Sequence, residues 1–548
     1  MQKNKLLLLV ASLLTLGFLV VAAAQENVFR EWRQIQRGLR SADGPLDVRL
    51  RQIVVPQLRV ADRCVSCHVG MAPGETGLTG GKMAAAHPKV GHEPADFGCI
   101  VCHGGQGRAT DKADAHGDVH FWPEPMVPRR YADAGCGSCH THLAVPSLAA
   151  LRGGRAAFER LDCLACHKLE GRGGTLRPAG GGMEGPDLSR AGLSGFAADW
   201  YAKHLTKDGA VWKQSFGAIP AADLAALDVL LRSRVGAPGL VEGKALFHSL
   251  GCRGCHKVAG VGGDDGPDLT REGAKDPGRI DFTHVPGRKD LAGWLGEHFR
   301  SPAAIVPGSA MPMLGLSEEE IGHLVRYMLS LRHSPFPEAY WPKDRIRAER
   351  FGEREFATDG ATLYGSFCSA CHGAEGQGMR YPGLPAFPAI ANRDFLELAP
   401  DALILETVRK GRSGRRMPAW GLKDGGLRPA EVLAVAAYVR TLGGNVAQAP
   451  DPKPARWAQG NAATGTRLYA AYCASCHGPN GEGKEGTALA NPVLLENATD
   501  TYLFETIRRG RRGTTMEGFG LPSTVRPSLS DQEIEDLVTF LRKGKGGA

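Results

Sequence analysis

The pattern of apolar and polar residues begins with one long apolar run at the N-terminus. Residues 6–24 are uninterrupted weakly polar to apolar, and Lys3 and Lys5 precede them. The run has the features of an export signal, with Ala22 and Ala24 placed for cleavage, and it is also long enough to be an uncleaved membrane anchor. In either case the lysines stay on the cytoplasmic side, so the rest of the chain is expected to be periplasmic or otherwise extracytoplasmic.

The remaining apolar pattern has helical spacing in four places and predicts a mainly α fold. Each of the four predicted amphipathic helices ends a segment of about a hundred residues, and no second apolar run is long enough to span a membrane. The signals are the capping boxes Ser317/Glu320 and Ser530/Glu533, a helix start at Pro429 with a stop at residues 443–444, and a weaker stripe at Leu224, Leu227 and Leu231.

Internal repeats divide the chain after residue 150 into two pairs of related units. Residues 154–158 (GRAAF) and 243–247 (GKALF) are each followed by a Gly-rich stretch and a Trp-x-x-x-His pair, whereas residues 364–373 (YGSFCSACHG) match 469–478 (YAAYCASCHG). Pro-rich and charged segments between units read as linkers. The predicted boundaries are a signal peptide or anchor at 1–24, an N-terminal module at 25–145, unit 1 at 146–236, unit 2 at 237–334, a linker at 335–357, unit 3 at 358–445, a linker at 446–459, and unit 4 at 460–548.

Composition and charge fit several small globular units. A chain of 548 residues with 23% charged and 43% hydrophobic residues is neither disordered nor a polytopic membrane protein. The formal net charge of +8 falls to +6 without Lys3 and Lys5, and a nucleic-acid binder would concentrate more positive charge. Binding to nucleic acid is therefore not expected.

The cysteines carry the strongest chemical signal, because all fourteen fall in seven Cys-x-x-Cys-His motifs. In this spacing two thiols can add to the vinyl groups of haem while the adjacent histidine becomes the proximal ligand of the iron. Neither a disulfide framework, nor redox-active dithiols, nor zinc sites would need a following histidine seven times. We therefore predict seven covalently bound haem c groups, at Cys64, Cys67 and His68; Cys99, Cys102 and His103; Cys136, Cys139 and His140; Cys163, Cys166 and His167; Cys252, Cys255 and His256; Cys368, Cys371 and His372; and Cys473, Cys476 and His477.

The order of helix, CxxCH, Gly-rich loop, distal methionine and closing helix in units 1–4 resembles the class I cytochrome c domain. In the N-terminal module, a loop-rich triheme segment, residues 51–68 and 96–107 resemble the multihaem cytochromes that accompany bc-type quinol oxidoreductases. These resemblances imply electron transfer, with redox proteins as partners, and no catalytic side chains are expected.

The second axial ligand is predicted separately for each haem. Met311, Met417 and Met516 lie in Gly/Pro-rich or polar loops before the closing helices and are expected to be ligands, whereas Met313, Met328 and Met379 look structural. Histidines crowd into the N-terminal module and predict bis-His coordination there. The candidates are His87, His92, His116 and His120, with His142 as a further possibility.

Unit 1 departs from its sibling, because no methionine stands where unit 2 has Met311. Lys213, Met183, a histidine from a neighbouring unit, or an open iron position all remain as alternatives for the haem at His167.

Arginine-rich loops precede Met417 and Met516, at 409–416 and 508–512. They predict either a docking surface for an acidic redox partner or local pairing, including with haem propionates.

Together these features predict an electron conduit. We expect electrons to enter from a membrane quinol-oxidising complex at the triheme module and to leave through the Met-ligated units to a soluble carrier or terminal oxidase. Two alternatives are a small-molecule redox enzyme acting at the haem on Cys163 and Cys166, and the cytochrome subunit of a membrane-bound dehydrogenase.

Overall fold

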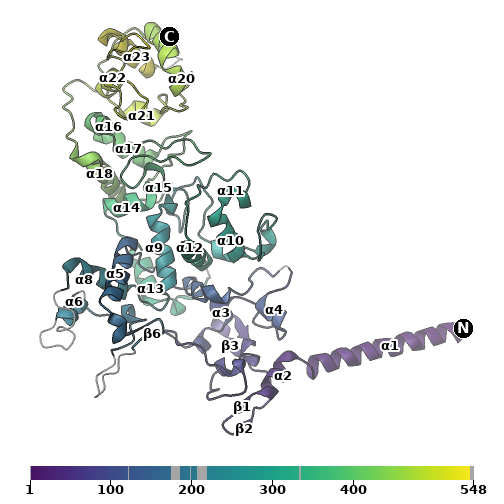
Figure 1. Cartoon of the computed structure of the whole chain (residues 1–548). Helices are drawn as coiled ribbons and strands as arrows, with labels where there is room; N and C mark the ends of the chain where they lie inside the picture. Colours follow the sequence, from purple (N-terminus) through teal and green to yellow (C-terminus); the bar gives the residue numbers. More distant parts are fainter. Residues whose placement is uncertain are drawn as a thin grey trace.

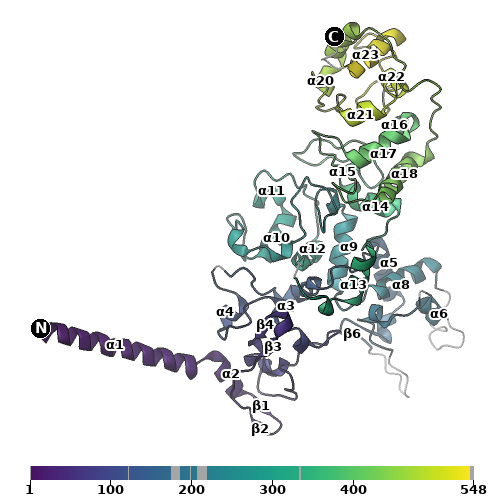
Figure 2. The same cartoon turned by 180° about the vertical axis from the view of Figure 1, so that it is seen from behind.

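The computed structural model describes residues 2–120, 122–174, 185–197, 199–206, 219–332 and 335–543. The molecule is elongated: helix α1 (Gln2–Asn27) projects from the N-terminal module, and unit 4 lies at the opposite end with the C-terminus (Figures 1 and 2). Helix α1 is long and apolar enough to cross a membrane and is not buried against the rest of the protein, properties that signal sequences share. Both predictions for this segment therefore stay open.

The N-terminal module has few regular elements, as its loop-rich sequence predicts. A small core gathers around the β3–β4 hairpin, in which Val54 pairs with Ala61. Its helices and strands are α2 (Glu31–Gly38), β1 (Arg40–Ser41), β2 (Gly44–Pro45), β3 (Ile53–Val55), β4 (Val60–Asp62), α3 (Ile100–His103) and α4 (Lys112–His116).

Units 1–4 confirm the mainly α prediction and share one arrangement. In each unit the helix that leads into the CxxCH motif packs against the closing helix. These pairs are α5 (Leu148–Arg160) with α8 (Ala221–Arg232), α9 (Pro238–Ser249) with α12 (Glu318–Ser330), α14 (Gly360–Phe367) with α18 (Pro429–Asn445), and α19 (Ala462–Tyr472) with α23 (Asp531–Lys543). The elements between them are β5 (Lys168–Leu169), β6 (Arg172–Gly173) and α6 (Trp200–Thr206); α10 (Leu291–Arg300) and α11 (Pro302–Ile305); α15 (Ser369–His372), α16 (Arg393–Leu398) and α17 (Asp401–Lys410); and α20 (Ala474–His477), α21 (Pro492–Asn497) and α22 (Asp500–Arg509).

The predicted helix signals are confirmed. The Ser317 hydroxyl accepts a hydrogen bond from the Glu320 amide at 3.3 Å, and the Glu320 carboxylate accepts one from the Ser317 amide at 3.1 Å. Ser530 and Glu533 repeat this arrangement. Helix α18 begins at Pro429 and loses helical geometry at Leu442, where Gly443 and Gly444 take positive φ angles of 74° and 84°. The closing helices bury their apolar stripes, which fixes the leading helix and the attached motif.

The segment 335–357 is not a simple spacer. It contains α13 (Lys343–Phe351), whose Arg345 and Ala348 are buried, and Tyr340 contacts Phe97 of the N-terminal module with ring centroids 5.7 Å apart. The segment 446–459 has no helix, in keeping with an extended connection, and its Ala449 amide donates to the carbonyl of Glu397.

Candidate functional site

Each CxxCH motif forms a single tight helical turn, and in units 1–4 the histidine ring is held from behind. The Nδ1 atom of His256 lies 2.9 Å from the carbonyl oxygen of Pro267, so this nitrogen donates and Nε2 is left to bind a metal. The same contact recurs in the other three units, at His167 with Pro186 (2.9 Å), His372 with Pro388 (2.9 Å) and His477 with Thr487 (2.7 Å).

Glycines of the Gly-rich loops pack directly against these rings. A Cβ atom at Gly266 would lie 2.4 Å from Cε1 of His256, and one at Gly185 would lie 2.6 Å from Cε1 of His167. Unit 4 has Gly486 in the equivalent place. A side chain here would displace the histidine, so the loop acts as a close support for the ring.

Buried donors without protein partners lie near the motifs. They include Nδ1 of His298, Nη1 of Arg345 and Nη1 of Arg412. Burial and the neighbouring His256 lower the pKa of His298 to about 4. Haem carries two anionic propionates that accept such donors, so the residues present fit haem.

The competing chemistries fit less well. Among the described residues, no group of three or more His, Cys, Asp or Glu is arranged to hold a bare metal ion, as a zinc site would require. Burial raises the pKa to about 12 for Cys252 and Cys368, whereas a redox-active dithiol needs a lowered pKa. The lowered pKa values of Cys64 and Cys255 come mainly from a cysteine of a neighbouring motif and not from the second cysteine of the same motif.

Two contacts join motifs of different segments. The side chains of Cys64 and Cys99 lie beside each other, and their interaction lowers the pKa of Cys64 and raises that of Cys99. Cys255 of unit 2 and Cys371 of unit 3 make the same contact. A backbone contact also joins the second and third motifs, because Gly135 lies directly against Cys102. Five of the seven attachment segments therefore touch another one: those of His68, His103 and His140 in series, and those of His256 and His372 as a pair.

Histidines of the N-terminal module also meet in pairs. Burial is the main cause of the lowered pKa values of His68, His103 and His140, and in each case a second, nearby histidine contributes. The nearby histidines are His116 for His68, His87 and then His68 for His103, and His92 for His140, where Asp344 acts in the opposite direction. The His87 and His103 ring centroids are 6.1 Å apart. The Nδ1 atom of His142 lies 2.9 Å from the hydroxyl oxygen of Thr141. The role of His120 as a ligand stays a prediction.

The loops that carry Met417 in unit 3 and Met516 in unit 4 are closed by the same backbone hydrogen bond. The Arg412 amide donates to the carbonyl of Met417 at 2.9 Å, and the Arg511 amide donates to that of Met516 at 2.7 Å. In unit 2, Met311 packs against the core.

The methionines predicted to be structural differ in burial. Met328 is buried on α12, as its helical position predicts, whereas Met313 is 59% exposed.

Unit 1 has no methionine at the position of Met311, and the candidates for the second ligand of its haem lie elsewhere in the sequence. Lys213 and Met183 lie outside the described residues. His204 stacks on Trp200 with ring centroids 4.8 Å apart, and His298 stacks on Trp294 at the same distance, so the Trp-x-x-x-His repeat has one structure in both siblings.

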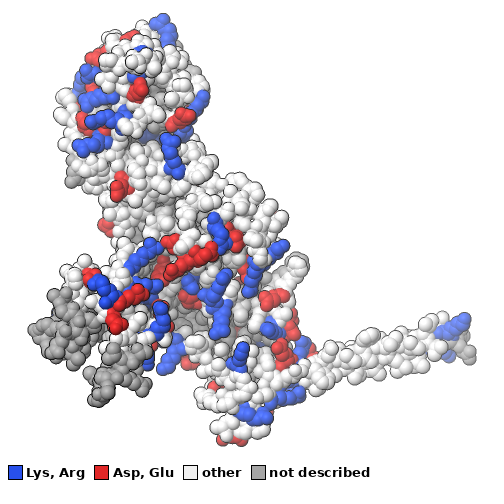
Figure 3. All heavy atoms as spheres, viewed as in Figure 1, with Lys and Arg blue, Asp and Glu red and all other residues white. Residues whose placement is uncertain are grey.

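The arginine-rich loops are largely paired within the protein. Arg416 bonds Asp265 of unit 2, and Arg512 bonds Asp394 of unit 3 at 2.6 Å. Other members pair with nearby glutamates: Arg409, Lys410, Arg508 and Arg509. Figure 3 shows basic and acidic side chains interspersed on the visible face. Of the two interpretations of these loops, docking and local pairing, the structure favours local pairing.

Because most of these charges are already paired with carboxylates, we expect electron transfer to an acidic acceptor protein to depend weakly on ionic strength. Stopped-flow oxidation of the reduced protein over a salt series measures this. A steep fall in rate with added salt would restore the docking interpretation.

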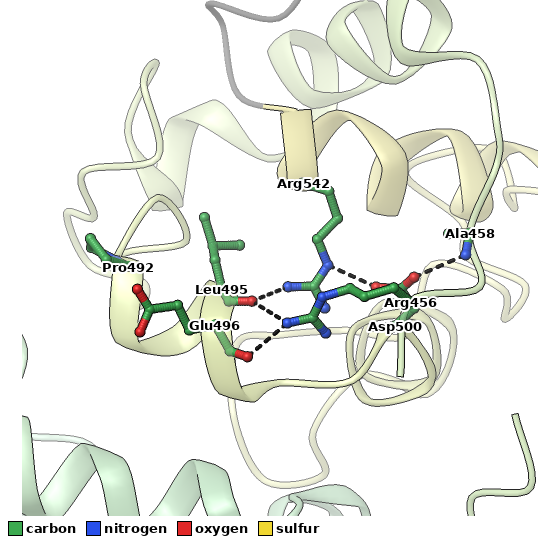
Figure 4. A pocket seen from close by; sticks show the side chains of 7 residues that line it. All are labelled: Arg456, Ala458, Pro492, Leu495, Glu496, Asp500 and Arg542. Atoms are coloured by element: carbon green, nitrogen blue, oxygen red, sulfur yellow. Dashed lines mark hydrogen bonds and ion pairs between the residues drawn. The ribbon is translucent and has the colours of Figure 1, made fainter. Parts of the chain in front are cut away.

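A surface groove in unit 4 contains further arginines, whose roles are structural (Figure 4). Arg542 pairs with Asp500 at 2.7 Å and, with Arg456, donates to carbonyls at the end of α21. In unit 3, Arg440 repeats this with Asp401 and the end of α16. The arginines of the groove therefore cap helix ends, and this structural role accounts for their presence there.

The helix pairs, the ring support and the CxxCH turns define c-type cytochrome domains, which carry covalently bound haem c and transfer electrons. The family described as cytochrome c oxidase, cbb3-type, subunit III matches residues 355–439 and 460–541, and the cytochrome c family matches residues 240–332. No solved structure matches the chain.

Curated relatives point the same way. The cbb3-type cytochrome c oxidase subunit FixP of Bradyrhizobium sp. (strain ORS 278) is 35% identical over 180 residues, which is 30% of this chain and 57% of the relative. Subunit CcoP of Azospirillum sp. (strain B510) is 27% identical over 250 residues, 42% of this chain and 74% of the relative. The chain thus spans little more than half the length of the first of these relatives.

Proposed function

We propose that the protein is a seven-haem electron conduit. The observation that carries this proposal is the contact between attachment segments, Cys64 with Cys99 and Cys255 with Cys371. A cysteine bonded to a haem vinyl group lies at the haem edge, so touching cysteines bring haem edges together. The polypeptide then supplies haem spacing, burial and axial ligands, and the haem supplies the redox chemistry.

The histidine pairs support bis-His coordination in the N-terminal module. With a metal–nitrogen bond of about 2 Å on each side, two imidazoles that share one iron have ring centroids about 6 Å apart. The 6.1 Å between His87 and His103 fits this spacing. We infer the axial pairs His68/His116, His103/His87 and His140/His92.

Ligand type gives the conduit a direction. Methionine raises the potential of haem relative to a second histidine, so electrons run from the N-terminal module toward units 2–4, with Met311, Met417 and Met516 as ligands. The donor is a quinol-oxidising membrane complex, and the acceptor is a terminal oxidase or soluble carrier on the extracytoplasmic side. The match of units 3 and 4 to an oxidase subunit family supports an oxidase at this end.

The experiment is a haem count followed by resolution of the ligand sets. Seven haem masses on the intact chain, with magnetic circular dichroism giving three bis-His and three His-Met haems, are the expected result. Fewer than seven haems, or Met-ligated haems in residues 25–145, would overturn the proposal. A cyanide-binding haem at His167 would favour the enzyme alternative, and copurification with a flavin or quinone enzyme would favour the dehydrogenase alternative.

A further inference from the structure

A buried ion cluster joins three parts of the chain at Glu355. Its carboxylate accepts hydrogen bonds from Nζ of Lys244 at 2.6 Å and from Nη2 of Arg253 at 2.5 Å. The side chains of Lys244 and Arg253 are only 5% and 1% exposed. Because removing charges from water is costly, ions this deep are stable only when each is paired and hydrogen-bonded.

Backbone groups complete the cluster and link the N-terminal module to unit 2. Lys244 Nζ also donates to the carbonyl of Leu143 at 2.7 Å, and the Val145 amide donates to the carbonyl of Glu355 at 2.7 Å. Arg253 donates to two carbonyls of its own unit. The segment 335–357 thus fixes the module against the unit.

His248 extends the cluster into unit 3. Nε of Arg253 lies 3.2 Å from Nε2 of His248, and Nδ1 of His248 lies 3.3 Å from the Ser366 hydroxyl. Burial and Arg253 lower the pKa of His248 well below its usual value, so the ring is neutral and Nε2 accepts. Arg253 stands between the cysteines of one motif and Ser366 stands two residues before Cys368, so the bonded path joins two attachment segments.

The cluster carries more positive than negative charge. Burial opposes ionisation of Glu355, but Lys244 and Arg253 outweigh it and hold its pKa at about 2. Burial also lowers the pKa of Lys244, and the carboxylates of Glu355 and, farther away, Asp344 oppose this effect. With Lys244 charged, the cluster holds two cations and one anion beside a neutral histidine. A buried positive charge interacts strongly through the low-dielectric interior and favours the haem state that has gained an electron.

We propose that the Glu355 cluster, made of Lys244, His248, Arg253 and Glu355, holds the attachment segments of units 2 and 3 together and raises the reduction potential of the haem on Cys252 and Cys255. The inference rests on the proposed function, since it requires that haem. Glu355 and Lys244 are positioning residues that act on the iron through charge and packing.

The test compares single charge changes in the full-length, haem-loaded protein. Lys244→Met removes one positive charge at similar volume, and Glu355→Gln removes the negative charge. Arg279→Gln is the matched control, because its side chain belongs to the same unit and is 88% exposed. Redox titration followed by absorption and magnetic circular dichroism gives the midpoint potentials.

We expect Lys244→Met to lower one of the seven potentials, Glu355→Gln to raise it, and Arg279→Gln to change none. The Lys244→Met/Glu355→Gln double variant keeps the original charge balance, so its potential returns toward that of the unmodified protein and remains measurable if Glu355→Gln alone does not fold. Shifts of the same sign, or no shift in protein with all seven haems, overturn the inference. A missing haem on Cys252 and Cys255 in the unmodified protein would instead overturn the proposed function.

Discussion

Replacing Gly266 with alanine is expected to displace the proximal histidine of unit 2 and to convert the haem of this unit to a high-spin form. The new Cβ atom would lie 2.4 Å from Cε1 of His256, closer than any stable contact. The ring cannot move away easily, because its Nδ1 is hydrogen-bonded to the carbonyl of Pro267 at 2.9 Å. Overpacking of this kind costs about 1–3 kcal/mol. Absorption and magnetic circular dichroism spectra measure the high-spin fraction, and thermal unfolding measures the stability.

Gly322 provides the matched control in the same unit. It lies in α12, and a Cβ atom there would meet nothing within 4 Å. Gly322→Ala should leave every haem low-spin and stabilise the helix by up to about 1 kcal/mol. If Gly266→Ala behaves like this control, the packing of the loop against His256 does not determine the coordination of the haem.

Replacing Met311 with histidine is expected to lower the potential of the same haem by a few hundred millivolts. Axial ligands set haem potentials over a range of about 0.8 V, and methionine favours the reduced iron more than histidine does. Met311 packs against the core of unit 2, where its side chain is held in place. Redox titration of the full-length protein measures the shift.

Met313, two residues after Met311, provides the control for the assignment of Met311 as the axial ligand. Its side chain is 59% exposed, so Met313→His should leave all potentials unchanged. The prediction for Met311 fails if the two variants titrate alike, or if only Met313→His moves a potential.

Local sequence signals predicted the helices well. The capping boxes at Ser317 and Ser530 and the glycines at 443–444 act within a few residues of where they stand, so their effect survives any tertiary context. The apolar stripes of the closing helices are likewise read from one helix alone.

The roles of several charged residues depend on tertiary contacts that the sequence leaves open. The segment 335–357 reads as a linker because it is rich in proline and charge, yet Arg345 is buried in it and Glu355 binds Lys244. The arginine-rich loops read equally well as a docking surface, yet Arg416 and Arg512 pair with acids of other units. A sequence lists charges without showing which ones meet.

The sequence by itself determined the chemistry of this protein. Two thiols and a histidine within five residues suffice to specify haem attachment, because that chemistry is local. Which attachment segments touch was decided only by tertiary structure. Cys255 and Cys371 stand more than a hundred residues apart, and they meet because the packing of α9 and α14 and the buried charges around Glu355 hold two units together. Such contacts depend on the shape and charge of several segments at once, and no single segment encodes them.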